Sequence, residues 1–242
     1  MDIYGVHINY IDYGKKDGLP LVFLHGWGQN ISMMEPLGNN FIEENRVIIL
    51  DLPGHGGSSE PTSPWQLTDF VEMLKEFLKE LKVEKPVLIG HSFGGKISLL
   101  YASKYDVSKL ILFGSPFRKE IKKMSIKTKV LKALKKVPVL NKLEEFAKQH
   151  IGSTDYKNAS PLMRQILVNH VNTDITLDVQ KINVPTLIIW GTNDYTVPIN
   201  EAYELEKLIK DSAVIPYENC THYAYLENLG QTINVINSFI KE

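Results

Sequence analysis

The chain repeatedly alternates a short, unbroken run of apolar residues with a longer segment of mixed polarity. An unbroken apolar run is typical of a parallel strand that is buried on both faces of a sheet. Runs of this kind lie at residues 21–24, 47–50, 87–89, 110–113 and 186–190, with a shorter one at 213–215. Each parallel neighbour requires a crossover connection, which a helix usually supplies. The alternation therefore predicts an α/β fold, with a mostly parallel central sheet that has helices on both faces.

Two other periodicities lie around these runs. Between residues 67 and 81, apolar side chains recur three and four positions apart and lysine and glutamate fill the opposite face, which predicts an amphipathic helix over 68–81. A similar pattern predicts a closing helix over residues 231–240. Residues 6–13 alternate polar and apolar side chains, which predicts a half-exposed strand.

The alternation stops between residues 115 and 181. This stretch has no buried-strand run, its pattern is helical, and it is interrupted at Pro138, Gly152 and Pro161. We therefore predict an α/β core built from residues 1–114 and 182–242, with residues 115–181 inserted as a helical cap.

Composition and charge exclude several classes of protein. The 28 acidic and 27 basic residues give a formal net charge of -1, which argues against nucleic acid as the main partner. The apolar runs are far shorter than the ~20 residues needed to cross a bilayer, and residues 1–13 lack the cationic start and apolar run of a secretion signal. The single cysteine, Cys220, cannot form an intrachain disulfide. These features predict a soluble, cytoplasmic protein that does not insert into a membrane.

The segment around Ser92 is the most informative motif. The apolar run at 87–89 leads into a Gly-x-Ser-x-Gly turn centred on Ser92, and a helical pattern follows over 97–101. A serine on a tight strand-to-helix turn needs very small residues two positions away on each side, and Gly90 and Gly94 meet this requirement. The positive end of the following helix would face charge that develops beside the serine. Ser92 is therefore the predicted nucleophile.

A nucleophilic serine needs a base that accepts its proton and an acid that orients the base. Asp194 lies in the loop after the apolar run 186–190, and His222 follows the last run, 213–215. Both positions are at the carboxyl ends of predicted parallel strands, which is the edge where such sheets bind ligands. The predicted catalytic triad is Ser92, His222 and Asp194.

Acyl transfer also needs hydrogen-bond donors for the oxyanion. These are usually the amide after the nucleophile and an amide from the loop after an earlier strand. Phe93 supplies the first, and Trp27 supplies the second, from a His-Gly-Trp-Gly loop that follows the run 21–24. Trp27, Phe93 and Phe117 are also the predicted lining of an apolar substrate pocket.

Taken together, these motifs closely resemble the α/β-hydrolase superfamily. In its members, a His-Gly-x-Gly loop, an Asp-x-Pro-Gly-x-Gly-x-Ser segment, a serine elbow, an acid and a histidine follow one another along the chain; the second motif is at residues 51–58 here. The order of the predicted serine, acid and histidine is also that of the superfamily. The resemblance implies the α/β-hydrolase fold, and it gives Asp51 and His55 roles in shaping a turn.

Other assignments of the site residues are weaker. Some members of the superfamily carry the acid after the strand at 110–113, but residues 114–116 are Gly-Ser-Pro here. Cys220 lacks an elbow of its own and is predicted to be a packed apolar side chain. The histidines are scattered without the paired spacing of a zinc site, so no metal is predicted.

The predicted function is hydrolysis of a small-to-medium carboxylic ester or thioester through an acyl-enzyme, without a cofactor. The chain also resembles the haloalkane dehalogenases and epoxide hydrolases of this fold. These classes are disfavoured, because they place a carboxylate where Ser92 stands. Three alternatives keep the same triad: a carbon–carbon bond hydrolase acting on a diketone, an amidase or iminopeptidase, and a small-ligand sensor. The sequence carries no signal for oligomeric state.

Residues 118–136 form a basic stretch in the predicted cap. Nine lysines and arginines stand against one acid, Glu120, which gives a local charge of +8, and apolar residues are interleaved. One hypothesis is that this stretch contacts an anionic surface, or an acyl chain on an acidic carrier. The other is that it forms a solvated, lysine-rich helix face.

Overall fold

The computed structural model describes residues 1–119 and 159–241. The strands of the main sheet are β3 (Tyr10–Gly14), β4 (Leu19–Leu24), β5 (Asn45–Leu50), β6 (Val87–His91), β7 (Lys109–Phe113), β8 (Thr186–Gly191) and β9 (Ser212–Tyr217). Within the described ranges they form a seven-stranded sheet in the order β3-β5-β4-β6-β7-β8-β9. The edge strand β3 is antiparallel to β5, and the other pairs are parallel. The predicted α/β sheet is confirmed, because every predicted apolar run lies inside one of these strands.

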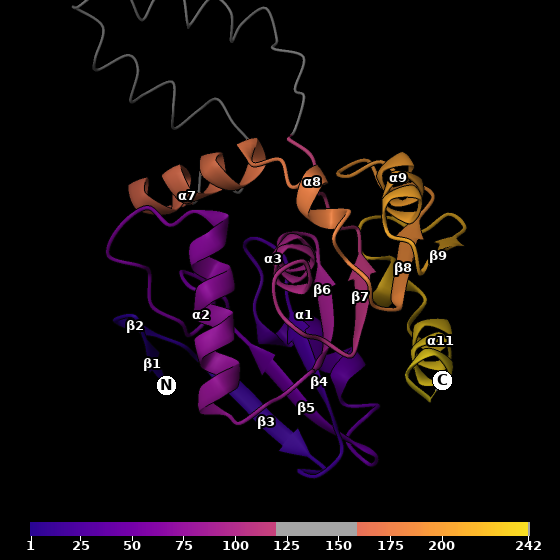
Figure 1. The fold of residues 1–242 in the computed structure, drawn as a ribbon, viewed down its shortest axis with the longest axis horizontal. Coiled ribbons are helices and arrows are strands. Elements are labelled where there is room, and N and C mark those ends of the chain that lie inside the picture. The colour runs from indigo at the N-terminus through magenta and orange to yellow at the C-terminus, as the bar shows by residue number, and fades with distance from the viewer. Residues whose placement is uncertain (120–158, 242) are drawn as a thin grey trace, which may run out of the picture.

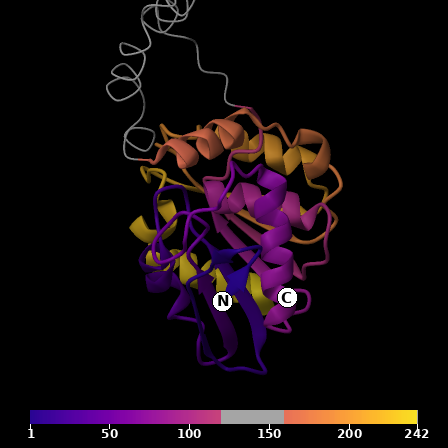
Figure 2. The same ribbon diagram turned by 90° about the vertical axis from the view of Figure 1, so that its left-hand side faces the viewer.

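Helices cover both faces of the sheet (Figures 1 and 2). One face carries α2 (Leu67–Glu80), α3 (Phe93–Ala102) and α9 (Asn200–Leu208), and the other carries α1 (Ile31–Gly38), α10 (Ala224–Glu227) and α11 (Leu229–Lys241). Successive side chains of a strand point to opposite faces. Leu24 and Leu88 therefore join the core under α2 and α3, whereas Phe23 and Ile89 join the core under α1 and α11.

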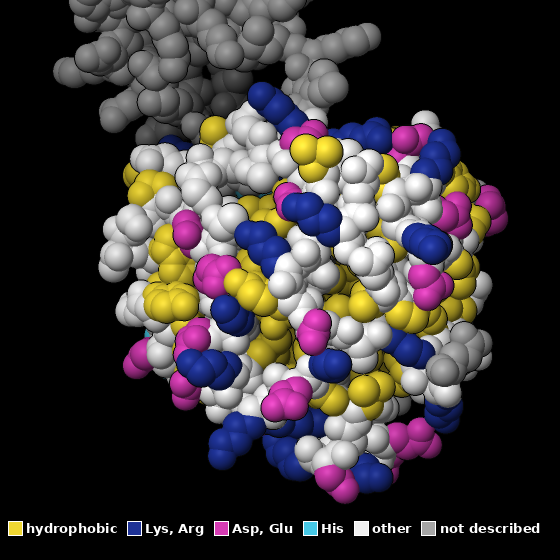
Figure 3. Space-filling view, viewed as in Figure 1, with side chains coloured by type: hydrophobic (Ala, Val, Ile, Leu, Met, Phe, Trp, Pro, Cys, Tyr) yellow, Lys and Arg dark blue, Asp and Glu magenta, His cyan; other side chains and the backbone are white. Residues whose placement is uncertain are grey.

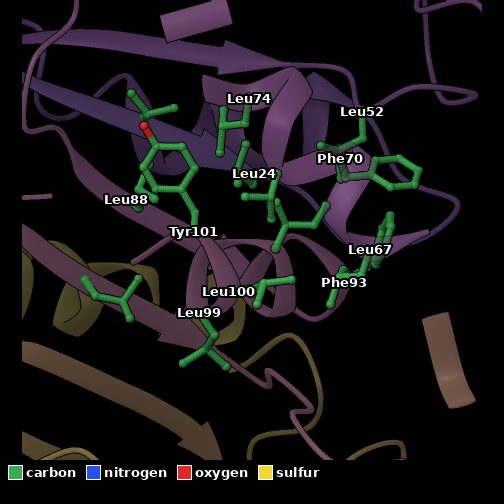
Figure 4. Packing of buried hydrophobic residues seen from close by; sticks show 14 of the residues in the cluster. Leu24, Leu52, Leu67, Phe70, Leu74, Leu88, Phe93, Leu99, Leu100 and Tyr101 are labelled. Atoms are coloured by element: carbon green, nitrogen blue, oxygen red, sulfur yellow. The ribbon is translucent and has the colours of Figure 1, made fainter. Parts of the chain in front are cut away.

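Figure 4 shows the core between the sheet and helices α2 and α3. Phe70 and Leu74 of α2 and Leu100 of α3 lie around Leu24 and Leu88 of the sheet. The buried face of α2 is the apolar stripe that predicts this helix. The helix begins one residue earlier than predicted, at a cap where the side chain of Asp69 accepts the main-chain N–H of Gln66 at 2.6 Å.

The N-terminal segment differs from its prediction. The prediction of a single strand over residues 6–13 is wrong. Instead, β2 (Val6–His7) pairs with β1 (Asp2–Ile3) in a separate hairpin, and β3 begins at Tyr10. Between β2 and β3, Asn9 donates its main-chain N–H to Oγ of Ser58 at 2.9 Å and its side-chain amide to Asp51 at 2.7 Å. Asn9 thus binds the loop after β5 instead of continuing a strand.

Residues 159–181 lie across the top of the molecule in Figure 1, above α2 and α3. They form α7 (Pro161–Asn172) and α8 (Thr176–Val179), as the helical pattern predicts. Pro161 is the first residue of α7, where a missing N–H is tolerated, so it starts a helix. Residues 120–158 lie outside the described residues, and with them lie Pro138, Gly152 and most of the basic stretch 118–136.

The surface carries charges of both signs. On the face shown in Figure 3, lysine and arginine side chains are interspersed with aspartate and glutamate. Arg118, at the described start of the basic stretch, forms an ion pair with Glu204 at 3.0 Å. Among the described helices, none combines the length and the apolar character that a membrane span requires.

Candidate active site

Ser92 lies on the turn between β6 and α3, with φ 51° and ψ −111°. A positive φ is uncommon for a residue with a side chain, and it indicates strain held by the surrounding structure. The N–H of Ser92 donates to the carbonyl oxygen of Phe113 at 2.9 Å. A β-carbon at Gly94 would collide with the carbonyl oxygen of Leu24, so the turn requires glycine there. The local geometry is therefore the tight strand-to-helix turn that the sequence predicts.

Asp194 and His222 come together at the carboxyl edge of the sheet. Oδ2 of Asp194 lies 2.7 Å from Nδ1 of His222, and the other carboxylate oxygen accepts the N–H groups of Thr196 and Val197 at 2.8 Å each. The side chain of Asp194 is fully buried, and these amides fix its carboxylate. Because an ionised carboxylate only accepts hydrogen bonds, Nδ1 carries the hydrogen, and Nε2 of His222 keeps a lone pair that can accept a proton.

The turn at Ser92 meets the His222 loop through the residues beside it. The imidazole centroids of His91 and His222 are 4.7 Å apart, and Nε2 of His91 donates to the carbonyl oxygen of His222 at 3.0 Å. Gly114, which follows the residue that binds the Ser92 amide, lies against the imidazole of His222. The structure thus brings all three predicted triad residues to one edge of the sheet.

The predicted oxyanion donors also lie together. The rings of Trp27 and Phe93 have centroids 5.3 Å apart, and Gly94 donates its N–H to the carbonyl oxygen of His25 at 3.1 Å, which joins the loop after β4 to the start of α3. In the part of the chain that the structure describes, the main-chain N–H groups of Trp27 and Phe93 have no hydrogen-bond partner. Both amides are therefore available to an anionic oxygen.

The three residues predicted to line a pocket differ in exposure. The side chain of Trp27 is partly exposed, whereas Phe93 and Phe117 are fully buried in the core under α2 and α3. The main chain of Phe117 accepts the N–H of Ile175 at 2.9 Å, and the guanidinium of Arg118 lies 4.7 Å from its ring. Contact of these side chains with a substrate stays a prediction.

Asp51 has the structural surroundings that the resemblance implies. Oδ1 accepts the N–H of Ile31 at 2.7 Å, and Oδ2 accepts the N–H of Gly57 and the side-chain amide of Asn9, both at 2.7 Å. Its carboxylate thus joins three segments of the chain. Nδ1 of His55 donates to the carbonyl oxygen of Pro53 at 3.0 Å within the same turn.

The comparison with known protein families decides the identity of the fold. The sequence profile described as alpha/beta hydrolase fold matches residues 20–126 and 123–229. The chain belongs to the α/β-hydrolase family. This assignment confirms the resemblance and the predicted fold class.

Individual α/β hydrolases resemble the chain over nearly its whole length. AB hydrolase superfamily protein YisY of Bacillus subtilis is 29% identical and covers 92% of this chain and 91% of its own length. A pimeloyl-[acyl-carrier protein] methyl ester esterase of Aliivibrio fischeri is 27% identical, and the match covers 94% of this chain and 96% of the length of that esterase. Among solved structures, an esterase from Exiguobacterium antarcticum has a TM-score of 0.77 at 27% identity, and covers 98% of this chain and 97% of its own. These comparisons support hydrolase activity for this α/β hydrolase.

Sequence reasoning missed a polar network behind the predicted triad. The side-chain oxygen of Gln29 accepts the N–H of Gly26 at 3.0 Å, and the same carboxamide lies 3.2 Å from Nδ1 of His91 and 3.3 Å from the hydroxyl of Tyr223. His91 in turn binds the carbonyl of His222. Gln29 and His91 thus connect the loop after β4 to the loop of the predicted base. Nothing in the sequence near residue 29 indicates this role.

His25 links the loop after β4 of this α/β hydrolase to the loop after β5. Nδ1 donates to the carbonyl oxygen of Gly26 at 2.7 Å, and Nε2 accepts the N–H of Leu52 at 2.9 Å. Burial, and then repulsion from His55, lowers the pKa of His25 to about 4. The imidazole is therefore neutral at neutral pH and holds the loop in place.

Two further expectations concern sulfur and metals. Cys220 is half-buried, and burial raises the pKa of its thiol, so little thiolate forms at neutral pH. Among the described residues, no group of three or more histidine, cysteine, aspartate or glutamate side chains is arranged to hold a metal ion.

Proposed function

We propose that this α/β hydrolase is a carboxylesterase that cleaves a small-to-medium carboxylic ester or thioester through an acyl-enzyme. The observation that carries the proposal is the 2.7 Å contact between Asp194 and His222 beside the strained turn at Ser92. A buried carboxylate that holds an imidazole in one tautomer is the arrangement that activates a serine.

In the proposed mechanism, Oγ of Ser92 attacks the carbonyl carbon while Nε2 of His222 accepts the hydroxyl proton. The tetrahedral oxyanion accepts hydrogen bonds from the amides of Trp27 and Phe93. When the intermediate collapses, His222 gives the proton to the leaving alcohol or thiol, and the acyl group stays on Ser92. A water molecule, deprotonated by His222, then attacks the acyl-enzyme, which releases the acid and restores the serine.

Two of the similar proteins support ester chemistry. Both a curated relative and a solved structure are esterases, each similar over nearly the whole chain. The substrate is proposed to be a small-molecule ester, because Trp27 is the accessible aromatic beside the oxyanion amides. We keep a cytoplasmic location as part of the proposal, because the chain has a single cysteine and needs no oxidising compartment.

Activity profiling with a fluorophosphonate probe and a chain-length series of p-nitrophenyl esters tests this function. The wild type is expected to be labelled and to turn over many short esters, and Ser92→Ala is expected to lose both activities. Ser63→Ala, which changes an exposed loop serine, is the matched control and should keep both.

Three outcomes would contradict the proposal. Labelling that persists in Ser92→Ala would place the nucleophile elsewhere. A single burst of product followed by a stall would indicate a sensor that keeps the triad. Turnover of proline amides or diketones with no turnover of esters would favour one of the other hydrolase classes.

A further inference from the structure

His170 is the residue of α7 that packs against the proposed oxyanion residues. Its imidazole centroid is 4.3 Å from that of the Phe93 ring, and its plane is parallel to the indole of Trp27, with centroids 6.4 Å apart. The side chain is only 7% exposed. The segment inserted after β7 thus places a polar side chain against the rings of the two residues whose main-chain amides are proposed to bind the substrate carbonyl.

One nitrogen of this imidazole is unpaired. Nδ1 of His170 is buried and has no hydrogen-bond partner among the residues that the structure describes. Buried polar atoms in folded proteins nearly always have a partner, and an unpaired one destabilises the protein. A ligand oxygen that reached Nδ1 would recover the missing hydrogen bond, and a methylene group in the same place would not.

A buried lysine anchors the backbone of His170. Lys96 is 1% exposed, and its Nζ donates to the carbonyl oxygens of His170 at 3.0 Å and of Thr173 at 2.6 Å. Lys96 belongs to α3, the helix that begins directly after Ser92. The end of α7 is therefore tied to the helix of the nucleophile, which keeps His170 at a fixed place relative to Ser92.

The chemistry of Nδ1 selects the kind of oxygen. Burial, and then the charge of Lys96, holds the pKa of His170 well below its usual range, so the imidazole is neutral. A neutral imidazole nitrogen is either a donor or an acceptor, and a hydroxyl group can pair with both. The leaving oxygen of the ester must face His222, whereas His170 lies against Trp27 and Phe93. The matching oxygen therefore belongs to the acyl part of the substrate.

We propose that His170 is a specificity-determining residue whose Nδ1 hydrogen-bonds a hydroxyl group on the acyl part of the substrate. The proposal rests on the esterase function proposed above. It names hydroxyacyl esters as the preferred substrate class over plain acyl esters of the same length.

The test compares p-nitrophenyl butyrate with its 2-hydroxy and 3-hydroxy derivatives. In the wild type, kcat/KM for at least one hydroxybutyrate is expected to exceed that for butyrate about tenfold or more, because a site built to bind a hydroxyl is left unpaired by the analogue without it. The ratio falls toward one in His170→Leu. In His170→Asn, which keeps a polar atom close to the place of Nδ1, part of the preference remains.

Val168→Ala is the matched control, because Val168 is an exposed residue of the same helix, and its ratio should equal that of the wild type. The thermal midpoint of His170→Leu should be at or above that of the wild type, since the unpaired nitrogen is gone. A wild-type ratio of one, or an equal ratio in the wild type and His170→Leu, would overturn the inference. If one of these two ratios is found while Ser92 is labelled and butyrate is turned over, only this inference fails. If Ser92 is not labelled and butyrate is not turned over, the esterase function fails as well.

Discussion

Gly114 lies so close to His222 that a β-carbon at position 114 would stand 2.8 Å from Nδ1 of the imidazole. Gly114 follows β7, where some α/β hydrolases carry their acid, and its φ is +52°. Any side chain at position 114 would therefore push against a histidine that already binds Asp194. Glycine at position 114 thus leaves the space that His222 occupies when it binds the acid at position 194.

We expect Gly114→Ala to lower kcat about 100-fold, because a displacement of about 1 Å in a catalytic group can have an effect of that size. The measurement is steady-state hydrolysis of p-nitrophenyl butyrate. Gly5→Ala is the matched control: Gly5 has a φ of +76° but open space around its α-carbon, so it carries the backbone strain without the collision. Equal kcat values in the two variants would show that the contact with His222 has no effect on catalysis.

Asp194→Asn tests the orientation of the imidazole. The amide keeps an oxygen for the N–H groups of Thr196 and Val197, so the loop should stay folded. The amide NH2, however, presents hydrogens to Nδ1 and favours the tautomer in which Nε2 carries the proton. If Asp194 is the acid of a serine triad, we expect kcat to fall by about 10⁴-fold. Kinetics and far-UV circular dichroism check this together, and a variant that keeps a tenth of the activity would assign the acid role elsewhere.

His91 is expected to act as a positioning residue for His222. Its Nε2 donates to the main-chain carbonyl of His222, and glutamine can place a donor near the same point, whereas leucine cannot. We expect His91→Leu to lower kcat about tenfold with little change in KM, and His91→Gln to recover most of the loss. The split between kcat and KM separates positioning from substrate binding. If the two variants were equally impaired at equal thermal stability, the donor would not be the reason for the loss.

Much of the fold could be predicted because its core strands are buried on both faces. Each such strand leaves an unbroken apolar run that needs no partner to be recognised. The helices α1 and α9 leave no comparable signal. Pro36 lies inside α1, and α9 spans only Asn200–Leu208 and fully buries just Ala202 and Leu205, so any apolar stripe in these helices is short.

The candidate site divides in the same way. Asp194 and His222 could be placed because each lies in the loop after an apolar run, and the carboxyl ends of parallel strands share one edge. His170 and Lys96 could not be paired, because the contact joins residues 74 positions apart and uses a main-chain carbonyl. The one visible sign was Lys96 itself, a charged residue within the otherwise uncharged stretch 93–102.

The buried histidines are expected to make the protein less stable in acid. The pKa of His25 is lowered to about 4 in the folded protein, and those of His55, His91 and His170 are also lowered, in each case chiefly by burial. The unfolded chain therefore binds protons near pH 6.5, and the folded chain does not until a lower pH. The contribution of these histidines to the free energy of unfolding is therefore fully present above pH 6.5 and is lost as the pH drops toward 4.

His25→Asn isolates one of these protons. At pH 7.5 the variant should be less stable than the wild type, because the hydrogen bond from Leu52 to Nε2 is lost. Between pH 6.5 and 5, the stability difference should shrink by about 2 kcal/mol, since each pH unit below the unfolded pKa removes about 1.4 kcal/mol from the wild type but not from the variant. Urea unfolding of both proteins at several pH values measures this difference. A stability difference that is constant over this range would mean that the folded protein protonates His25 as readily as the unfolded chain does. That result would conflict with the burial of the imidazole and its two hydrogen bonds.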